Sequence, residues 1–423
     1  MKNLQHFKKT EIGLIPNDWE LKKFSEIFSF LSTGTYSRAQ IHEEGDVGYI
    51  HYGDIHTKLD FKVDTSKYVS GFVSEIEGKP YARIRQGDLI IADASEDVNG
   101  IGKSIEVINQ PANKVISGLH TFLARDIRDT FALGFKGYID SNILVKKQYI
   151  KLASGLKVYS LSKANFDKIW LPIPPLAEQR KIAQALTDAD NYISALEKLI
   201  EKKKMMKEGL INRFFSNNQD WKELTLFDIA ENNRSLFNDG DWIEAEYITS
   251  EGVRLIQTGN IGIGKYVDKE ANKKYVSEAS FQLLNCKVLK DQDILICRLA
   301  EPAGRACIFH ATSEKTITSV DVTIFRPKTE KYNRNFLVYA MSMPTWFSKI
   351  SENVGGTTHK RISRSNLGEI TIKVPNLATQ NRIAQILTTM DNQLDLLIGK
   401  LEKAKSIKIG MMQKLLTGEI RLA

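Results

Sequence analysis

Residues 176–190 read LAEQRKIAQALTDAD, and residues 377–391 read LATQNRIAQILTTMD. Nine of these fifteen aligned positions are identical, at a constant offset of 201 residues in a chain of 423. An internal repeat fixes the architecture of a chain before any single motif does. The duplicated phrase therefore predicts that one structural unit occurs twice.

The repeat extends well upstream of that phrase. DLIIADA, which begins at Asp88, matches DILICRL from Asp293, and DWELKKFSEIF from Asp18 matches DWKELTLFDIA from Asp220. The residues that recur at the offset of 201 include Phe135, Tyr138, Ser141, Gly155, Ser162, Asn165, Ile169 and Pro174, which return as Phe336, Tyr339, Ser342, Gly356, Ser363, Asn366, Ile370 and Pro375. Each half is predicted to be a variable globular region followed by one long helix. The predicted boundaries are 1–172 for the first globular region, 173–216 for the first helical region, 217–374 for the second globular region, and 375–423 for the second helical region with the C-terminal tail.

The two repeated stretches are predicted to be long helices with an apolar seam. Apolar residues follow the spacing 4, 3, 4, 3, 4 in both copies, which is the a/d pattern of helices that pack side by side. The seam residues are Ile182, Leu186, Ala189, Ile193, Leu196 and Ile200 in the first copy and Ile383, Leu387, Met390, Leu394, Leu397 and Leu401 in the second. About 40 residues per helix correspond to about 55–60 Å at 1.5 Å per residue. Two like helices in one chain can pack antiparallel, which predicts an approximate internal twofold axis.

The globular regions are predicted to be mixed α/β (α+β). Short β-branched and aliphatic runs such as VGYIHY, DLIIADA and TSVDVTIF are bounded by Gly, Asp and Asn, as strands are. Segments such as NRNFLVYAMSM indicate intervening helices. The pattern does not predict a strand order. The predicted fold therefore has two α/β regions separated by two long helices that pack as an antiparallel coiled coil.

The composition is that of an ordinary globular protein with a basic surplus. Lys and Arg number 59 against 51 Asp and Glu, which gives a net charge of +8 and a pI near 9.0. This surplus fits a polyanionic partner, but it is equally common among proteins that bind none. Cys286, Cys297 and Cys307 follow neither a disulfide nor a zinc spacing, which favours a reducing compartment. With no signal-peptide core and no run near 18 apolar residues, the chain is predicted to be cytoplasmic, with no membrane partner.

No stretch of the sequence carries a complete catalytic or metal motif. Gly102-Lys103-Ser104 ends like a phosphate-binding loop, but Asp97 stands where the leading glycine is required. LPIPPL lacks the Asn or Asp and the aromatic residue of an adenine methyltransferase motif. His51 and His56 have no matching ligand cluster. We therefore expect neither catalytic residues nor a metal site.

The repeat geometry itself suggests a DNA-reading device. An antiparallel helix pair holds one globular region near each end, and B-DNA offers equivalent groove surfaces about 34–36 Å apart per turn. Such a chain can read two separate half-sites and set the gap between them by its own stiffness. Because the globular regions differ in sequence, the half-sites are expected to differ as well.

The sequence resembles the specificity subunit of type I restriction–modification systems. The resemblance lies in LPIPPLAEQRKIAQ and KVPNLATQNRIAQ, in the LTGEIRL ending and in the TEIGLIPNDWELKKF opening, and it covers essentially the whole chain. It implies a non-catalytic subunit in which two target-recognition domains, 1–172 and 217–374, alternate with two conserved helical regions. The implied partners are double-stranded DNA, two methyltransferase (modification) subunits and, through them, restriction (motor–nuclease) subunits. S-adenosylmethionine and ATP are expected only on those partner subunits, so no cofactor is expected on this chain.

The resemblance also implies that the conserved helices pair with each other and dock the methyltransferase subunits. The residues assigned to this role are Leu176, Glu178, Gln179, Ile182, Leu186, Ile193, Leu196, Ile200, Leu377, Gln380, Ile383, Leu387, Leu394, Leu397 and Leu401. The second copy has Thr379 where the first has Glu178. A carboxylate contact made by Glu178 would be missing there, so the two docking faces are expected to differ in energy.

DNA contacts are expected on polar loops whose side chains can bond to base edges or phosphates. In the first domain these are Thr33, Thr35, Tyr36, Ser37, Arg38, His51, Tyr52, His56, Lys157 and Tyr159. In the second domain they are Gln257, Asn260, Arg298, Arg305, Thr357, Thr358, His359, Lys360 and Arg361. Any single one of these residues could equally be an ordinary loop or turn residue. The bases that they read do not follow from the sequence.

Two other functions remain open at this point. A scaffold whose coiled coil gathers partners without touching DNA would show the same repeat. A stand-alone modification enzyme is disfavoured because no cofactor motif is present. Binding to duplex DNA that depends on sequence and weakens with salt separates these alternatives.

Overall fold

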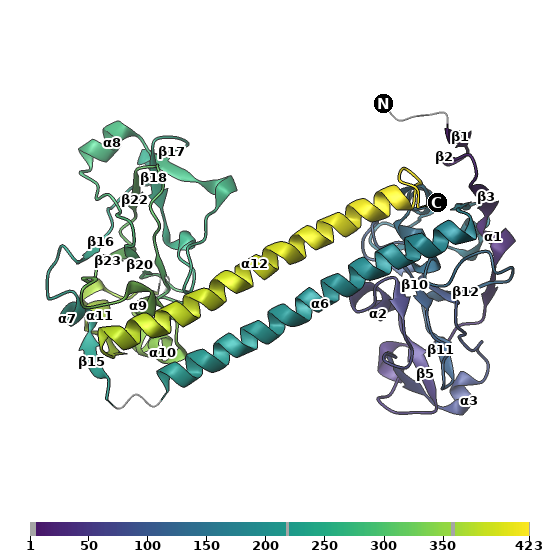
Figure 1. Ribbon diagram of the computed structural model, residues 1–423, viewed down its shortest axis with the longest axis horizontal. Helices are drawn as coiled ribbons and strands as arrows, with labels where there is room; N and C mark the ends of the chain where they lie inside the picture. The colour runs from purple at the N-terminus through teal and green to yellow at the C-terminus, as the bar shows by residue number, and fades with distance from the viewer. Residues whose placement is uncertain (1–5, 217–219, 357–359, 423) are drawn as a thin grey trace. The chain divides into compact units, whose positions relative to one another are not determined.

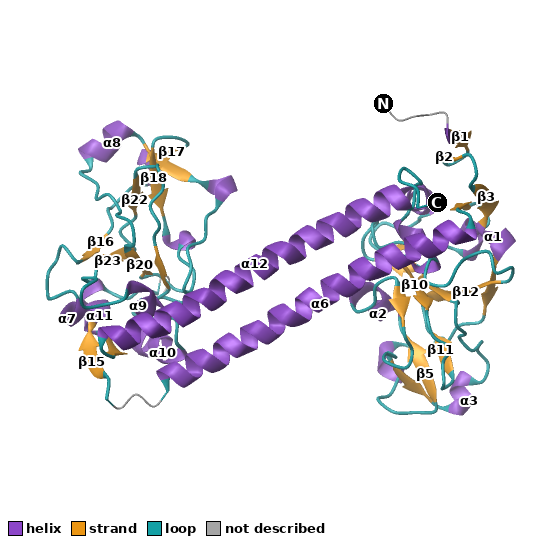
Figure 2. Cartoon of the chain, in the orientation of Figure 1, coloured by secondary structure: helices purple, strands orange, loops and turns teal. Residues whose placement is uncertain are grey.

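A computed structural model describes residues 6–216, 220–356 and 360–422 (Figure 1). The chain groups into two compact units, which we name unit 1 (residues 1–199 and 398–423) and unit 2 (residues 200–397). Each unit contains short strands, short helices and parts of two long helices (Figure 2). The predicted mixed class, with two repeated globular regions and two long helices that pack together, is confirmed. The unit boundaries fall inside the long helices, whereas the predicted domain boundaries lie at the helix ends.

Unit 1 is built around two small sheets, with strand orders β4-β12-β8-β10-β6 and β11-β5-β7. The strands of the first sheet are β4 (Phe28–Leu31), β12 (Thr121–Asp126), β8 (Leu89–Ala92), β10 (Ser104–Val107) and β6 (Lys62–Val63), and those of the second are β11 (Val115–Ser117), β5 (Val47–Ile50) and β7 (Gly71–Val73). Two-stranded pairs are β1 (Phe7–Thr10) with β2 (Gly13–Pro16), β3 (Glu20–Lys23) with β14 (Trp170–Ile173), and β9 (Ala94–Ser95) with β13 (Tyr159–Ser160). The short helices are α1 (Phe24–Ile27), α2 (Tyr52–Thr57), α3 (Glu75–Gly78), α4 (Ile143–Leu152) and α5 (Lys163–Phe166), with 3-10 turns at Arg38–Gln40 and Lys136–Ser141. Every residue of β8 is buried, as expected for an apolar strand covered on both faces.

Unit 2 repeats this plan with two four-stranded sheets, ordered β16-β23-β20-β21 and β17-β19-β18-β22. The strands are β16 (Phe237–Asp239), β23 (Val322–Phe325), β20 (Ile294–Cys297) and β21 (Ala306–Ile308) in the first sheet, and β17 (Ile248–Thr249), β19 (Lys274–Val276), β18 (Val253–Ile256) and β22 (Thr316–Thr318) in the second. A separate pair joins β15 (Lys222–Thr225) to β24 (Thr371–Val374). The short helices are α7 (Leu226–Ile229), α8 (Glu278–Leu283), α9 (Arg334–Ala340), α10 (Pro344–Glu352) and α11 (Arg364–Glu369), with 3-10 turns at Ala245–Tyr247, Thr258–Asn260 and Glu270–Asn272.

The long helices are α6 (Leu176–Phe215, 40 residues) and α12 (Leu377–Leu415, 39 residues). Within each unit, earlier residues of one helix meet later residues of the other, so the two helices run antiparallel as predicted (Figure 1). The polar contacts between them are Asp190–Lys408 and Glu197–Lys405 in unit 1, and Lys203–Gln393 and Lys207–Asp391 in unit 2. Within the described residues, no helix is long and apolar enough to cross a bilayer.

The predicted apolar seam is buried along most of its length, although its first positions have a different partner. The fully buried seam residues are Ile182, Leu186, Leu196, Ile200, Ile383, Leu387, Leu394 and Leu401, and Ile193 and Leu397 are half-buried. Ile182 and Leu186 join the core of unit 1's globular part, and Ile383 and Leu387 join that of unit 2. Leu176 was assigned to the same set but is 43% exposed, because it stands at the very start of α6. Leu377 opens α12 in the same way and is half-buried.

Gln179 and Gln380 fasten the start of each long helix to its own globular region. The Gln179 Oε1 accepts a hydrogen bond from the N–H of Ala132 at 2.8 Å, and its Nε2 donates to the carbonyl of Pro174 at 2.8 Å. The Gln380 side chain repeats this with the N–H of Asn333 and the carbonyl of Pro375, both at 2.9 Å. Both residues were expected to lie on a docking surface. That assignment is corrected, because both side chains are buried and hydrogen-bonded within the chain.

Glu178 is also directed inward, onto the C-terminal tail. Its carboxylate accepts hydrogen bonds from the guanidinium of Arg421 at 2.7 and 2.8 Å and from Trp19 Nε1 at 3.0 Å. Arg421 also pairs with Asp18 at 2.7 Å. Burial works to raise the pKa of Glu178, but the hydrogen bonds from Arg421 and Trp19 outweigh it and hold that pKa below its usual value. Glu178 therefore clamps the tail of unit 1, a role that Thr379 cannot reproduce in unit 2 because it lacks a carboxylate.

Candidate nucleic-acid interface

In unit 1, a strand end, a turn and a loop are joined by backbone hydrogen bonds. Asp93 directly follows β8, and its N–H donates to the carbonyl of His120 at 3.1 Å. The carbonyl of Asp93 accepts from the N–H of Leu161 at 2.9 Å. His120 lies in the turn between β11 and β12, and Leu161 follows β13. These bonds hold three separate segments at the end of the central strand.

Unit 2 contains the same bonds. Arg298 directly follows β20, and its N–H donates to the carbonyl of Asp321 at 2.8 Å, while its own carbonyl accepts from Ile362 at 3.0 Å. Asp93 is therefore equivalent to Arg298, and His120 is equivalent to Asp321. We name this shared arrangement the recognition frame. The first position of the frame is Asp93 in unit 1 and Arg298 in unit 2. The second position is His120 in unit 1 and Asp321 in unit 2.

A fourth segment joins each frame through the second sheet. The N–H of Gly118 donates to the carbonyl of Ile50 at 2.9 Å, and that of Ser319 donates to the carbonyl of Ile256 at 3.1 Å. The residues that follow these carbonyls therefore correspond, which aligns HYGDI (from His51) with QTGNI (51–55 with 257–261). Both segments come directly after buried strands, β5 and β18, so their polar side chains are presented at the ends of those strands.

In unit 1 the frame gathers a histidine–aromatic cluster. His120 Nδ1 lies 3.3 Å from Asp93 Oδ1, and the side chain of His120 is half exposed. The ring of Tyr52 packs edge-on to His120 with centroids 5.3 Å apart, and the Nε2 of His56 lies 2.9 Å from the carbonyl of Ala94. Burial raises the pKa of Asp93, while the nearby His120 acts in the opposite direction. The cluster offers an imidazole, a phenol and a carboxylate, all groups that bond to base edges or phosphates.

Arg38 is held against helix α2 of unit 1 by Asp54. Its guanidinium donates to both carboxylate oxygens of Asp54, at 3.1 and 2.5 Å, and its side chain remains 47% exposed. Burial works to raise the pKa of Asp54, but the hydrogen bonds from Arg38 outweigh it and keep that pKa well below its usual range. Tyr36 lies in the same loop, and its carbonyl accepts a 2.8 Å hydrogen bond from the Tyr49 hydroxyl. This loop is therefore ordered by two internal contacts.

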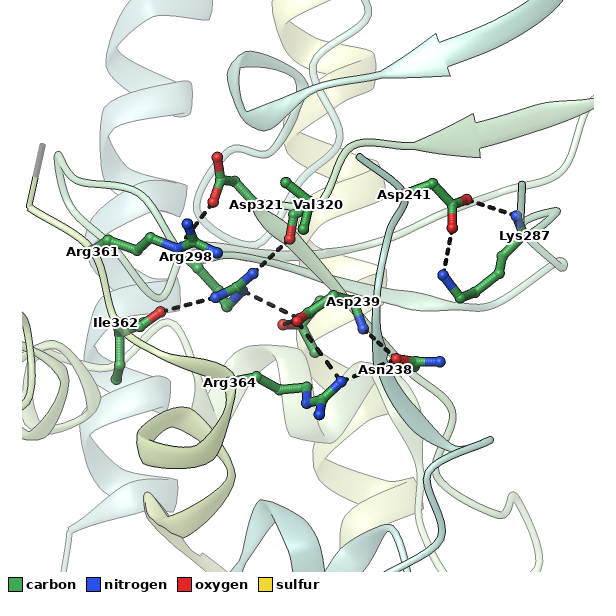
Figure 3. A network of polar contacts seen from close by, with 11 residues as sticks. Asn238, Asp239, Asp241, Lys287, Arg298, Val320, Asp321, Arg361, Ile362 and Arg364 are labelled. Atoms are coloured by element: carbon green, nitrogen blue, oxygen red, sulfur yellow. Dashed lines mark hydrogen bonds and ion pairs between the residues drawn. The ribbon is translucent and has the colours of Figure 1, made fainter. Parts of the chain in front are cut away.

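In unit 2, the side chain of Arg298 is buried and supports the frame, so it is not exposed for contact with DNA. Its Nη2 donates to the carbonyl of Val320 at 2.6 Å, its Nη1 donates to that of Ile362 at 3.3 Å, and its Nε lies 3.2 Å from Asp239 Oδ1 (Figure 3). Asp239 also accepts a hydrogen bond from Thr323 at 2.9 Å. The side chain of Arg298 is only 3% exposed. It ties together the strand, turn and loop that form the frame.

Arg361 lies beside Arg298 but is partly exposed. Its Nε is 3.1 Å from Asp321 Oδ1, and its side chain is 40% exposed (Figure 3). Arg305 has the opposite situation, because its guanidinium donates to the carbonyls of Ile261, Glu301 and Pro302 at 2.7–2.9 Å. The guanidinium of Arg361 therefore has fewer bonds within unit 2 than that of Arg298 or Arg305.

A pocket of about 520 Å³ opens next to the unit 2 frame. Its lining includes Asp321, Gln257, Lys269, Lys274 and the indole of Trp242, which is 66% exposed. A Cβ placed on Gly259 would lie 2.6 Å from the Nζ of Lys269, so the ammonium lies directly against that glycine. The pocket combines an aromatic face, amide groups and ammonium groups, which are the groups that bind nucleotides.

The predicted unit 1 residues fall into three classes of exposure. Thr35, Arg38 and Lys157 are exposed, Thr33, Tyr36, Ser37, Tyr52, His56 and Tyr159 are half-buried, and His51 is buried. The Nδ1 of His51 accepts from the N–H of Gly53 at 3.1 Å, which makes it a cap for α2. The structure brings Tyr52, His56 and Tyr159 to the end of β8 and β9, whereas Lys157 lies in the exposed loop before β13.

The predicted unit 2 residues divide more sharply. Lys360 is exposed, and Arg361, Arg305 and Gln257 are half-buried. Thr357, Thr358 and His359 lie outside the described residues. The assignments of Arg298 and Asn260 to DNA reading are corrected to internal roles, because both are buried and hydrogen-bonded within unit 2. Asn260 accepts from the N–H of Gln257 at 3.0 Å and donates to the carbonyl of Val267 at 3.0 Å.

Three of the four side chains at the corners of the two frames were not predicted from the sequence. Asp93, His120 and Asp321 were not among the expected contacts, nor were Lys269 and Lys274 on the pocket rim. A signal was present, because the aligned runs DLIIADA and DILICRL place Asp93 opposite Arg298 directly after a buried strand. A polar residue at the end of a buried strand is a standard position for a binding side chain.

The fold and the two frames define a class of protein: a two-unit recognition chain whose equivalent positions carry different chemistry. A model of the type I restriction modification DNA specificity domain matches residues 16–204 and again residues 218–406. The chain therefore belongs to the type I restriction modification DNA specificity family, with two copies of the domain. It is a specificity subunit, in which two domains recognise DNA sequence, and the family's domain is not catalytic.

Two individual relatives illustrate the family. The chain is 24% identical over 444 residues to the type I restriction enzyme MjaVIII specificity subunit of Methanocaldococcus jannaschii, which covers 99% of this chain and 96% of that protein. The crystal structure of the type I restriction–modification system S subunit from M. genitalium has the same fold, with a TM-score of 0.57 at 16% identity, over 94% of this chain and 96% of that one.

Proposed function

We propose that this specificity subunit reads a split target in duplex DNA, one half-site for each unit, and docks two methyltransferase subunits. The observation that carries the proposal is the recognition frame, which has the same backbone bonds in both units but different side chains at equivalent positions, with opposite charges at Asp93 and Arg298. The shared backbone frame indicates that both units have the same task. The different side chains indicate that the two units recognise different sequences. In this proposal S-adenosylmethionine and ATP are bound by the partner subunits, and the cytoplasmic location stays a prediction.

A domain exchange tests the split target. Replacing residues 1–172 by the corresponding domain of another family member changes one half-site and leaves the other unchanged, as read by methylome sequencing of the host. A change in both half-sites would contradict the proposal that each unit reads one half-site. Absence of sequence-dependent duplex binding, with and without partner subunits, would favour the scaffold function instead.

The helices support the docking part of the proposal. Several apolar side chains on them are exposed, and they are available to form part of an apolar surface for a partner. These are Leu199, Ile398, Ile407 and Ile409 in unit 1, and Met205, Met206 and Leu396 in unit 2. They replace Glu178, Gln179 and Gln380 as the expected docking residues. Changing Leu396 (67% exposed) to Asp is expected to weaken retention of a methyltransferase subunit in size-exclusion chromatography, whereas Asn392→Asp, an exposed polar position on the same helix, is expected to leave it unchanged.

The spacer part of the proposal rests on the length of the helices. The 40 residues of α6 correspond to about 60 Å at 1.5 Å per residue, and α6 begins in unit 1 and ends in unit 2. Adding four residues near Leu199 is expected to change the number of unread base pairs between the half-sites. An unaltered gap in the methylome would refute the spacer role.

A further inference from the structure

The guanidinium of Arg361 is only partly occupied within the chain. Its Nε pairs with Asp321 at 3.1 Å, and its side chain is 40% exposed. The two terminal nitrogens make no hydrogen bond to the part of the chain that the structure describes, and Figure 3 shows Arg361 turned toward Asp321 at the edge of the network. An arginine in this state offers two parallel N–H donors on its outer edge.

The backbone on both sides of this pair is fixed. The N–H of Arg361 donates to the carbonyl of Gly355 at 2.9 Å, and the N–H of Gly355 donates back to Arg361 at 3.0 Å. The carbonyl of Asp321 is held by the N–H of Arg298 at 2.8 Å, and the carbonyl of the preceding Val320 by the Arg298 side chain at 2.6 Å. A donor held this way loses little conformational freedom on binding, which favours specific contact.

The charge next to Arg361 decides which nucleic-acid group it suits. A phosphate brought to its outer edge would also approach the carboxylate of Asp321, and the two negative charges would repel. A base edge is neutral and carries no such penalty. Of the base edges in the major groove, that of guanine presents two acceptors, O6 and N7, spaced for the two donors of one arginine.

The surroundings supply the phosphate contacts that such a reading needs. Asp321 lines the pocket of about 520 Å³ whose lining also carries Lys269 and Lys274. Both lysines are exposed, and neither has an ion pair within the described residues. Ammonium groups hold phosphates without sequence preference, while a fixed arginine reads the base.

We propose that Arg361, oriented by Asp321, donates two hydrogen bonds to O6 and N7 of a guanine in the half-site that unit 2 reads; this rests on the proposed function. Asp321 is a positioning residue, because it acts through Arg361. The equivalent of Arg361 in unit 1 is Ser160, since Leu161 and Ile362 occupy matching bonds in the two frames. The contact made by Arg361 therefore has no counterpart at the equivalent position of unit 1.

The experiment uses the full chain in complex with its methyltransferase subunits. The target is first defined by methylome sequencing, and duplexes are then made with 7-deazaguanine, which lacks the N7 acceptor, at each guanine in turn. The wild-type complex is expected to lose roughly tenfold to hundredfold affinity at one guanine of the unit 2 half-site. Arg361→Ala is expected to lower affinity for the normal duplex by a similar factor and to be insensitive to 7-deazaguanine at that position.

Two further variants separate base reading from folding. Asp321→Asn is expected to reduce the preference for guanine over 7-deazaguanine at that position, with an unchanged melting temperature and unchanged discrimination in the unit 1 half-site. Arg234→Ala removes an exposed arginine of the same unit and is expected to change neither. If Arg361→Ala fails to fold, Arg361→Lys carries the same test, because a lysine cannot donate in the paired geometry.

The outcomes distinguish this inference from the proposed function. Wild-type complex that binds all duplexes equally would overturn both. Sequence-specific binding in which no guanine of the unit 2 half-site responds to 7-deazaguanine would overturn the Arg361 contact alone. A uniform loss of affinity in Arg361→Ala, with 7-deazaguanine sensitivity kept, would assign the side chain to phosphate and overturn it as well.

Discussion

The hydroxyl of Tyr138 donates a 2.7 Å hydrogen bond to Asp190, and the same carboxylate is paired with Lys408. The carboxylate of Asp190, on α6, thus binds both a tyrosine of the globular part and a lysine of α12. We name these three residues, and their equivalents in unit 2, a triad. Unit 2 repeats the arrangement, because the Tyr339 hydroxyl donates to Asp391 at 2.6 Å and Asp391 is paired with Lys207. The two triads fix the antiparallel register of the helices against their globular parts.

Removing the shared carboxylate is therefore expected to loosen a unit. Asp391→Ala leaves the half-buried hydroxyl of Tyr339 without its strongest acceptor and is expected to cost about 1–3 kcal/mol in the free energy of unfolding, measured in urea. Asp395→Ala, an exposed aspartate one turn further along α12, is expected to stay within about 0.5 kcal/mol of wild type. Equal losses in the two variants would show that the triad does not hold the register.

The clamp between Arg421 and Glu178 is expected to make the stability of unit 1 depend on pH. The pKa of Glu178 is lowered in the folded state, so its contribution is complete above its usual value near 4.5 and is lost as the pH falls toward the folded value. Arg421→Ala leaves the Glu178 carboxylate buried without its cation, which is expected to cost about 3 kcal/mol at pH 7. The difference in the free energy of unfolding between wild type and variant should become smaller below about pH 4, as measured by urea unfolding at several pH values.

A difference in the free energy of unfolding that stays constant from pH 7 to pH 3 would show that the clamp does not act through the charge of Glu178. Arg421→Lys is a useful comparison, because it keeps the positive charge but cannot make the paired contacts to Glu178 and Asp18. It is expected to recover only part of the loss.

Arg298→Ala is expected to destabilise unit 2 rather than to alter base preference directly. The change removes the buried cation beside Asp239 and two donors to backbone carbonyls, which is expected to cost about 3–5 kcal/mol. Thermal unfolding of the ligand-free chain measures this loss. A variant with wild-type stability but altered half-site preference would restore Arg298 to the set of base-reading residues.

Lys157 is expected to contact a phosphate. It is exposed in the loop before β13 and has no ion pair within the described residues. Lys157→Ala should weaken duplex binding equally for all sequences and reduce the slope of log affinity against log salt by about one. Lys147→Ala, an exposed lysine on α4, is the control and should leave the slope unchanged. An altered base preference in Lys157→Ala would contradict the phosphate assignment.

The repeat, the long helices and their pairing could be predicted because they depend on local periodicity. The spacing of Ile182 to Ile200, and of Ile383 to Leu401, specifies one apolar face regardless of the remaining chain. The strand order could not be predicted, because strands of two to six residues carry little periodic signal and pair across long separations.

The site residues were predictable only in part, and the errors have physical causes. Arg298 opens the run RLAEPAGR, whose Pro302 and Gly304 look like an exposed loop, yet it follows β20 directly and its side chain turns into the unit. Glu178 was assigned to a partner because its true partner, Arg421, is 243 residues away. Arg361 was identified from its loop, but the role of Asp321 depends on strand register, which the sequence does not reveal.

Because every bond that defines the recognition frame is made by main-chain atoms, the two units keep the same frame with different side chains at its corners. Asp93 and Arg298 occupy one such corner with opposite charges, and the strand, turn and loop around each still meet in the same way. Lineages of such proteins can therefore acquire new targets by changing exposed or half-buried side chains around the frame, such as Ser160 and Arg361, whereas a buried residue such as Arg298 has to change together with its partner Asp239.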